Sequence, residues 1–442
     1  MRILAFTAGA AGMYCGSCLR DNALAAELRA QGHDILLQPI YTPTLVDEAN
    51  VSDPHVLFGG ISVYLQQQSP LFRMLPKFVD KLWDSGYALR AASRRSIPVN
   101  PVFLGEMTVA MLQGETGPQR REFEKMADYL GHLPKPDVVT LPNSLVIAMG
   151  PVIKRTLGCP VLVTLQGEDL YLEGLKEPYR SESLKLLRNL VRTVDGFIAV
   201  SEFGARLMTS YLDLPKEKVR VVTLGVNTRD MDRGEPRKDG PFRVGYFARI
   251  TPEKSLHLLC EAYHLMRTKG GLPPSRIEAA GYIAPEQTAY LRTIEAQMKA
   301  WGLGDEFQYH GPLSREDKVR FLHSLDVLSV PSIYAETKGL FLLEAMSCGV
   351  PVVSPDHGAF PEMVRRTGGG LLVKPGDAQS FADALVRLYR DPRLREELGN
   401  RGHAGVREHY SVRQMAKRAL AAYDVGQISR SAEGSPDPDS FA

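Results

Sequence analysis

The chain has 442 residues, more than one hydrophobic core usually serves, so two domains of about 200 residues each are expected. Hydrophobic residues make up 44% and charged residues 24%, which excludes a wholly disordered chain. The 53 basic and 51 acidic side chains nearly balance at +2, which argues against a dedicated nucleic-acid binder. Five cysteines in so long a chain do not form a disulfide framework, and a reducing, cytoplasmic setting is the simplest expectation.

No apolar stretch approaches the roughly 20 residues that a membrane-spanning helix needs. The first residues, MRILAFTAGAAG, resemble a signal peptide only in outline. Their apolar core covers only residues 3–6, shorter than the ~7–15 residues that such a peptide has. A short buried strand that runs into a Gly/Ala loop is therefore expected.

The first half of the chain alternates short apolar runs with longer helical patterns. The apolar runs predict strands at residues 3–7, 34–39, 138–141, 161–165, 197–200 and 219–223, and the helical patterns lie at 21–29, 144–155, 182–192 and 204–211. Strands that read as continuous apolar runs between helices indicate a parallel sheet covered on both faces.

A polar stretch at 227–240 separates this half from a second one, and we place the domain boundary between residues 232 and 233. The alternation then restarts, with strands predicted at 242–247, 276–280, 307–309, 327–330 and 350–353 and helices at 254–266, 285–301, 315–322 and 340–347. The pattern predicts two doubly wound α/β domains in tandem, the first at 1–232 and the second at 233–410. The last residues, 426–442, contain few large apolar side chains and are predicted to be disordered.

Residues 56–131 fit the alternation poorly and are interpreted as a helical insertion in the first domain. Within it, residues 70–95 combine apolar residues at helical spacing with several Arg and Lys residues. Such a helix could contact an anionic membrane surface peripherally, at the inner face of a membrane. The alternative, which we favour, is a helix packed on its own domain, because amphipathicity is usual for a surface helix.

The strongest chemical signal follows the predicted strand at 327–330. Glu336 stands in the loop after the strand, and Gly339 precedes a helix that carries Glu344. The helix start at Gly339 and Leu340 offers backbone N–H groups and the positive end of a dipole to a phosphate. Glu344, one turn into the helix, suits the vicinal hydroxyls of a ribose because a carboxylate only accepts hydrogen bonds. Taken alone, the two glutamates are better explained as a capping residue and a solvated helix residue.

A second signal follows the first strand of the second domain, where Arg249 leaves the strand and Lys254 is predicted to open the next helix. Arginine grips phosphate oxygens as a fork and lysine adds a point charge, so the two cations suit a diphosphate. Alone, they fit a surface ion pair and a solvated lysine. Together the two signals fall at strand ends of one sheet and predict a nucleotide-diphosphate site. Because neither a Walker loop nor a metal-binding Asp-x-Asp accompanies these two signals, no metal or cofactor is expected.

The run PSIYAETKGLFLLEAMSCGVPVVSPDHGAFPEMV, with FARITPEKSL upstream and GLLVKPGD downstream, closely resembles the retaining glycosyltransferases of family 4, which have the GT-B fold. Their Glu-x7-Glu pair stands here as Glu336 and Glu344, and their Arg and Lys as Arg249 and Lys254. The resemblance covers most of residues 195–424 and is weaker before them. It implies two Rossmann-like domains facing a cleft, with a C-terminal helix at 411–425 crossing back to the first domain.

The resemblance also implies roles for individual residues. Arg249 and Lys254 would bind the donor diphosphate and stabilise the leaving group, while Glu336 would contact the donor sugar near the reacting carbon. Glu344 would hold the ribose, and the backbone of Gly339 and Leu340 would meet the distal phosphate. The remaining implied positions are the base-pocket residues His310, Gly311 and Leu313 and the loop glycines Gly12 and Gly16 near the diphosphate and acceptor.

One departure from the family concerns the turn after residues 161–165, where many relatives have a His close to the transferred sugar. Here the run is Gln166-Gly167-Glu168-Asp169. Glutamine can hydrogen-bond a sugar hydroxyl but cannot take a proton. Asp169 or Glu168 could serve instead, and a helix-capping role for either acid is the alternative.

Cys15 and Cys18 have the C-x-x-C spacing of a redox dithiol directly after a predicted strand. The alternative, favoured here, is a pair of small residues in a tight loop. The other three cysteines have no paired spacing, which argues against a zinc site.

The sequence as a whole predicts a retaining, metal-independent glycosyltransferase that uses a UDP- or GDP-linked sugar donor. Its acceptor, a glycan, a lipid or a small molecule, stays open. A catalytically inactive GT-B relative that acts as a binding or scaffold subunit is the alternative. A dinucleotide oxidoreductase is excluded because no Gly-x-Gly-x-x-Gly fingerprint follows residues 3–7.

Overall fold

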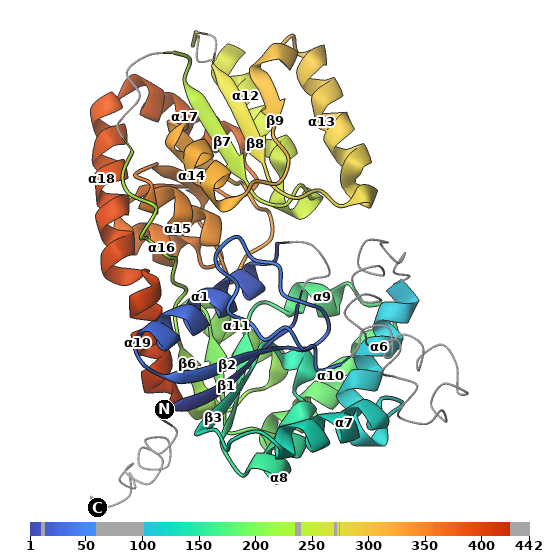
Figure 1. The fold of residues 1–442 in the computed structure, drawn as a ribbon. Helices are drawn as coiled ribbons and strands as arrows, with labels where there is room; N and C mark the ends of the chain where they lie inside the picture. The colour runs from blue at the N-terminus through green and yellow to red at the C-terminus, as the bar shows by residue number, and fades with distance from the viewer. Residues whose placement is uncertain (10–13, 59–100, 235–239, 269–271, 274, 425–442) are drawn as a thin grey trace, which may run out of the picture. The chain divides into compact units, whose positions relative to one another are not determined.

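The computed structural model describes residues 1–9, 14–58, 101–234, 240–268, 272–273 and 275–424. The chain forms two compact units: unit 1 comprises Met1–Thr223 and Ala416–Ala442, and unit 2 comprises Leu224–Met415. The boundary predicted at 232/233 falls shortly after unit 2 begins. Each unit is built on a parallel sheet, coloured blue to green in unit 1 and yellow-green to orange in unit 2 (Figure 1).

Unit 1 contains a parallel sheet of six described strands in the order β2-β1-β3-β4-β5-β6. The strands are β1 Arg2–Thr7, β2 Asp34–Pro39, β3 Val138–Leu141, β4 Val161–Leu165, β5 Gly196–Ala199 and β6 Val219–Val221. Every residue of β3, β4 and β5 is buried, so both faces of the sheet centre are covered. This burial is what the continuous apolar runs predict.

The helices of unit 1 are α1 Gly16–Ala30, α6 Pro101–Gln113, α7 Arg120–Gly131, α8 Met149–Leu157, α9 Asp169–Glu173, α10 Tyr179–Leu190 and α11 Glu202–Leu212. Asp195 joins helix and strand, because its carboxylate accepts from Lys154 Nζ of α8 at 2.8 Å and from the amide of Val161 in β4 at 2.8 Å. Ser201 caps α11 by accepting from the amide of Gly204.

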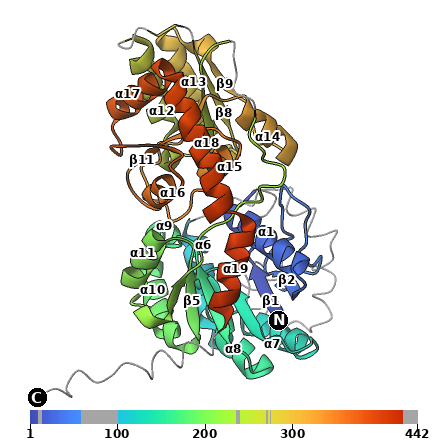
Figure 2. The same cartoon turned by 90° about the vertical axis from the view of Figure 1, so that its left-hand side faces the viewer.

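The last described helix, α19 Val412–Tyr423, belongs to unit 1 from Ala416 onward. Arg418 donates to Thr223 Oγ1 at 2.7 Å, and Arg220 donates to the carbonyl of Ala421 at 3.2 Å. Figure 2 shows α19 in red directly after α18. Helix α19 therefore packs on residues that precede unit 2 in the sequence.

Unit 2 contains a second parallel sheet of six described strands in the order β12-β11-β10-β7-β8-β9. The strands are β7 Arg243–Phe247, β8 Arg276–Ala280, β9 Phe307–Tyr309, β10 Val327–Ser329, β11 Val352–Pro355 and β12 Gly370–Val373. The helices are α12 Leu256–Thr268, α13 Thr288–Ala300, α14 Arg315–His323, α15 Leu340–Ser347, α16 Phe360–Thr367, α17 Ala378–Arg390 and α18 Pro392–His409.

The two parallel sheets confirm the predicted fold class of doubly wound α/β domains. The structure adds β12 and α16 to α18, for which the sequence pattern predicts no strand or helix. Two predicted helices are wrong at their starts, since 144–146 and 285–287 form separate 3₁₀ turns. The strand predicted at 350–353 begins two residues later, because Pro351 cannot donate to the ladder.

Several predictions fall on parts of the chain outside the described residues. These are most of the insertion, with its amphipathic helix at 70–95, the loop residue Gly12 and the tail at 426–442. The described part of the insertion, from Pro101, forms α6 and α7, whereas residues 56–58 are not helical. Among the described residues, no helix is both long and apolar enough to cross a membrane.

Gly358 fixes the distance between two loops at the carboxyl edge of unit 2. Its φ of +63° favours glycine, and a Cβ there would lie 2.6 Å from the carbonyl oxygen of Glu336. Gly376 has a similar φ of +69°, but a Cβ there would have no other atom within 4 Å. The two glycines thus share a left-handed backbone conformation and differ in the space available to a side chain.

Replacing Gly376 with Ala should cost about 1–2 kcal/mol of unfolding free energy, from the left-handed backbone alone. Gly358→Ala should cost more, because the Glu336 backbone must also move. Urea unfolding of both variants measures the difference. Equal losses of unfolding free energy would show that the backbone of Glu336 does not limit the space for a side chain at position 358.

Candidate functional site

Three loops at the carboxyl edge of the unit 2 sheet lie next to one another. They follow β7, β10 and β11, which are neighbours in the sheet order. Parallel strands present their carboxyl ends at one edge, where ligands bind in open α/β sheets. The predicted residues Arg249, Lys254, Glu336 and Gly339 all lie in these loops.

Tyr246 organises the first of these loops. Its side chain is fully buried, and its hydroxyl donates to the carbonyls of Arg249 at 3.0 Å and Lys254 at 3.4 Å. The prediction that Lys254 opens a helix is wrong: Lys254 ends a 3₁₀ turn at Pro252–Lys254, and α12 begins at Leu256. The reason is Ser255, whose φ of 56° interrupts the helix. One buried hydroxyl therefore holds the backbone of both predicted cations.

The loop after β10 is bonded to this first loop. The carbonyl of Glu253 accepts from Ser332 Oγ at 3.1 Å and from the amide of Ile333 at 3.1 Å. On the other side, the amide of Ala359 donates to the carbonyl of Glu336 at 2.7 Å. The backbone around Glu336 is thus held from both neighbouring loops.

Lys254 and Glu336, far apart in the sequence, form a direct ion pair with Nζ 2.5 Å from Oε2. Both side chains are largely buried, and the ammonium lies 5.3 Å from the ring centre of Phe341. Glu336 Oε1 is buried and has no hydrogen-bond partner within the described part of the chain. The pair therefore presents a fixed carboxylate with one oxygen still able to accept a hydrogen bond.

The Arg249 guanidinium is about half exposed, and its ionic contact with Glu253 is long, at 3.9 Å. A loosely paired, exposed arginine can turn toward an anionic ligand at small cost. Arg249 is thus the adjustable cation of the loop, whereas Lys254 is the fixed one.

Gly339 is the N-cap of α15, so the first amides of this helix, at Leu340 and Phe341, lie at the sheet edge. A Cβ on Gly339 would lie 3.1 Å from the Phe360 ring and 3.2 Å from Met363 Sδ. Its φ of 174° is ordinary extended backbone. Close packing against α16 therefore leaves little room for a side chain here, a reason for glycine that the sequence did not reveal.

Glu344 lies one turn into α15, as predicted, and is paired with a residue that sequence analysis missed. Lys318 of α14 places Nζ 2.6 Å from Glu344 Oε1, with only 2% of Lys318 and 7% of Glu344 exposed. Lys318 Nζ also lies 6.0 Å from the ring centre of Phe247. A detectable signal existed, because Lys318 stands three and four residues before the buried Phe321 and Leu322 on the inner face of α14.

His310 and Gly311 follow β9 at the same edge of the sheet. His310 Nε2 lies 2.7 Å from Glu278 Oε2, and its ring packs edge-on against Phe321. The amide of Gly281 donates to the Gly311 carbonyl at 2.9 Å. Leu313 is partly exposed just before α14.

The predicted residues of unit 1 follow the strands of the other sheet. Gln166, after β4, is buried; its Nε2 donates to the carbonyl of Pro142 at 2.8 Å, and its Oε1 has no partner among the described residues. Glu168 accepts from the amides of Ser144 at 2.9 Å and Gln166 at 3.0 Å, so it joins two loops. Asp169 is buried at the start of α9, and Gly16 begins α1.

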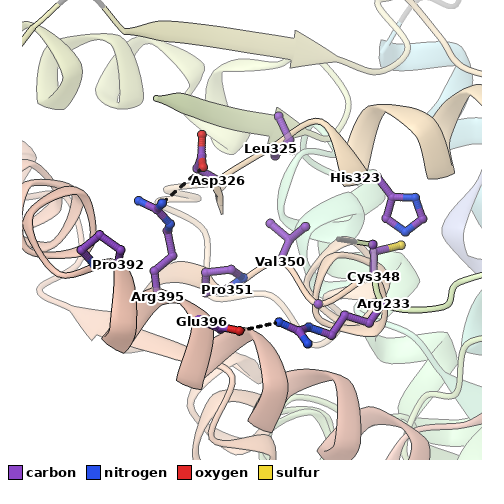
Figure 3. A pocket seen from close by; sticks show the side chains of 12 residues that line it. Arg233, His323, Leu325, Asp326, Cys348, Val350, Pro351, Pro392, Arg395 and Glu396 are labelled. Carbon is purple, nitrogen blue, oxygen red and sulfur yellow. Dashed lines mark hydrogen bonds and ion pairs between the residues drawn. The ribbon is translucent and has the colours of Figure 1, made fainter. Parts of the chain in front are cut away.

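A separate cavity of about 170 Å³ lies at the opposite, amino-terminal edge of the unit 2 sheet (Figure 3). Leu325, Asp326 and Pro351, which precede β10 and β11, form part of its wall. Its two arginines are paired, Arg395 with Asp326 at 3.7 Å and Arg233 with Glu396 at 3.1 Å. The cavity shares no residue with the site described above.

Within the described residues, no group of three or more His, Cys, Asp or Glu could hold a metal ion.

Comparison with known families identifies both halves of the chain. Residues 227–404 match the model for glycosyl transferases group 1, and residues 109–230 match the model for glycosyltransferase family 4. The two matched regions together span residues 109–404 and are similar to glycosyltransferase domains. The site residues of unit 2, from Arg249 to Glu344, all lie inside the group 1 match.

Curated relatives of these glycosyltransferase domains match over part of their length. The amylovoran biosynthesis glycosyltransferase AmsK of Erwinia amylovora is 31% identical over 180 residues, 39% of this chain and 42% of the relative. The D-inositol 3-phosphate glycosyltransferase of an Arthrobacter strain is 28% identical over 264 residues, 56% of this chain and 61% of the relative. The chain thus aligns with less than two thirds of the length of each.

Solved structures extend the likeness to nearly the whole chain and show that the fold is GT-B. HepE of Anabaena, solved in complex with UDP and glucose, has a TM-score of 0.66 at 17% identity, covering 95% of this chain and 98% of that one. Sucrose-phosphate synthase of Thermosynechococcus elongatus has a TM-score of 0.67 at 18% identity, covering 98% and 99%. At such identities the likeness concerns the fold.

The Lys318–Glu344 pair should be needed for the stability of unit 2. Replacing Lys318 with Met leaves the Glu344 carboxylate buried without its cation, which should cost about 3–5 kcal/mol of unfolding free energy. The double variant Lys318→Met/Glu344→Gln should recover most of this loss, because no buried charge remains. Chemical unfolding measures both.

Arg320, on the same helix, provides the control, because it pairs with Glu316 and Asp317 on an exposed surface. Arg320→Met should change stability only slightly. If Lys318→Met were equally mild, the Lys318–Glu344 pair would not be a buried, desolvated interaction.

Proposed function

We propose that the chain is a retaining glycosyltransferase that moves a sugar from a nucleotide diphosphate sugar to an acceptor. The observation that carries the proposal is the buried Lys254–Glu336 pair beside Arg249 and the start of α15. Two cations and a helix N-terminus converge at one sheet edge, where they suit a diphosphate. The matched glycosyltransferase models and the GT-B fold support it.

Bond cleavage at the donor leaves negative charge on the nucleoside diphosphate. Arg249, Lys254 and the amides of Leu340 and Phe341 would offset this charge as it develops. This is the role that a metal ion has in other transferases, and we propose that the reaction here uses these groups instead. Electrostatic stabilisation of a leaving group lowers the barrier because it acts more strongly in the transition state than on the substrate.

The remaining site residues would position the donor. Glu336, held by Lys254, would accept hydrogen bonds from hydroxyls of the donor sugar through Oε1. Glu344, held by Lys318, would accept from the ribose, and His310 with Gly311 and Leu313 would border the base. For retention, the acceptor hydroxyl attacks from the face on which the diphosphate leaves, and a diphosphate oxygen takes its proton.

For the donor base and for the acceptor, the proposal names classes of molecule and no single compound. Structures of HepE with UDP and with UDP-glucose favour a uridine donor for a chain of this fold, with a guanosine donor as the alternative. Glycan, lipid and small-molecule acceptors are all compatible with the site residues. The reaction is proposed to take place in the cytoplasm.

One observation favours the second candidate, an inactive GT-B relative that binds ligands or partners. Gln166 stands at the position where many members of the family have a histidine near the sugar, and its side-chain Nε2 already donates to the carbonyl of Pro142. Its buried Oε1 can still accept from one hydroxyl. Donor hydrolysis separates the candidates: slow release of sugar from UDP- or GDP-sugars supports the enzyme, and tight nucleotide binding without any turnover supports the binding subunit.

Arg249→Ala should weaken binding of UDP or GDP by about 1.5–3 kcal/mol, because a charged hydrogen bond to the diphosphate is lost. Lys254→Ala should have an effect of at least the same size. Arg276, an exposed arginine at the amino end of β8, serves as the control, and Arg276→Ala should leave affinity unchanged. Calorimetric titration measures all three, and equal affinities for wild type and Arg249→Ala would refute the assignment.

A further inference from the structure

Cys15 and Cys18 stand together at the beginning of α1, which follows β1 in unit 1. Cys15 is the N-cap of α1, and its carbonyl accepts from the amide of Leu19 at 2.9 Å, which closes the first helical turn. Residues three apart across such a turn lie on one face, about 5–6 Å apart at Cβ. A disulfide brings the two Cβ atoms to about 3.5–4.5 Å, so its closure also needs a small shift of the backbone at the start of the helix.

The two thiols differ in exposure. Cys15 is partly exposed, whereas Cys18 is 0% exposed. Their side chains are in hydrogen-bond contact, and this contact, with burial, raises the pKa of Cys18. Cys15 also lies at a helix N-terminus, which favours negative charge on its sulfur. Cys15 is therefore the accessible nucleophile, and Cys18 is a protonated thiol held against it.

A buried acid lies one turn further along the same face. Asp21 is 7% exposed and paired with the buried Arg20 at 2.9 Å through Oδ1. Burial raises the pKa of Asp21 to about 6, although the Arg20 guanidinium opposes the shift. Asp21 Oδ2 is buried, and the buried Thr7 hydroxyl lies beside both Asp21 and Cys18, where it lowers the pKa of each. The charge of Asp21 contributes to the raised pKa of Cys18, and the charge of Cys15 contributes to the raised pKa of Asp21. The three groups therefore form one electrostatic cluster.

We propose that Cys15 and Cys18 form a redox-active dithiol that a low-molecular-weight disulfide oxidises to an intramolecular disulfide, with Asp21 as proton acceptor. The Cys15 thiolate attacks one sulfur of the small disulfide, forms a mixed disulfide and releases one small thiolate. The Cys18 sulfur then attacks Cys15, while its proton passes to Asp21 Oδ2, and the second small thiolate leaves. Asp21 finally returns this proton to solvent, which also took the proton that Cys15 lost on ionisation, and the two small thiolates take up two protons from solvent. Two protein thiols thus become one disulfide, and the small disulfide becomes two thiols.

The other cysteines provide an internal comparison. Cys159, Cys260 and Cys348 are buried, and burial raises the pKa of each. The pKa of Cys348, for example, rises to about 12. A buried thiol without a neighbouring thiol is inert toward exchange, so these three should stay reduced when Cys15 reacts.

The test exposes the full-length folded protein to oxidised glutathione, quenches with an alkylating reagent at intervals, and analyses peptides by mass spectrometry. Trypsin cuts after Arg2 and Arg20, so residues 3–20 carry both cysteines in one peptide. We expect this peptide to lose two hydrogen atoms, while Cys159, Cys260 and Cys348 remain alkylated. Oxidation of these three at the same rate as Cys15, or no loss of hydrogen from residues 3–20, would overturn the proposal.

Three variants assign the steps. Cys18→Ser should accumulate one glutathionyl group on Cys15, and Cys15→Ser should leave Cys18 unmodified. Asp21→Asn should form the mixed disulfide normally but resolve it about tenfold more slowly, because the proton acceptor is lost. If Cys18 reacted equally fast without Cys15, or if Asp21→Asn resolved at the wild-type rate, the assigned roles would be wrong. Thermal unfolding confirms that each variant is folded, and the wild-type result needs no variant.

Discussion

Two buried lysine–glutamate pairs fix the carboxyl edge of the unit 2 sheet, and the candidate site depends on them. Lys254 holds Glu336, and Lys318 holds Glu344, at 2.5 Å and 2.6 Å. Both glutamates come from the segment that follows β10, whereas the lysines come from two other segments of unit 2. Since a charged group leaves water at high cost unless it is paired, each lysine offsets the cost of burying its glutamate and holds the carboxylate in one orientation.

The same edge shows how backbone groups support side-chain chemistry. The Tyr246 hydroxyl donates to the carbonyls of Arg249 and Lys254. The Glu253 carbonyl accepts hydrogen bonds from the Ser332 hydroxyl and the Ile333 amide in the loop after β10. These bonds tie together loops that belong to neighbouring strands. A site built in this way is already organised before a ligand arrives, which reduces the entropy that binding must overcome.

Unit 1 contains a different kind of chemistry at the start of α1. Cys15, Cys18 and Asp21 share one helical face, and the buried ion pair between Arg20 and Asp21 lies beside them. Burial disfavours the charged form of Asp21 and raises its pKa to about 6. The carboxyl group can therefore accept and release a proton near neutral pH. The two units therefore use buried ionisable groups differently: unit 2 buries them as lysine–glutamate ion pairs, whereas unit 1 buries a carboxyl group whose pKa is raised to about 6.

The sequence by itself determined the two parallel sheets and most of their strands, and it singled out the candidate residues Arg249, Lys254, Glu336 and Glu344, because apolar periodicity and motif spacing are local properties. It did not reveal Lys318, whose partner Glu344 lies on another helix. Nor could it show that Gly339 packs closely against the ring of Phe360, or that Cys18 and Asp21 are buried together. Such pairings depend on which surfaces the helices turn toward one another, and only the packing of the tertiary structure decides that.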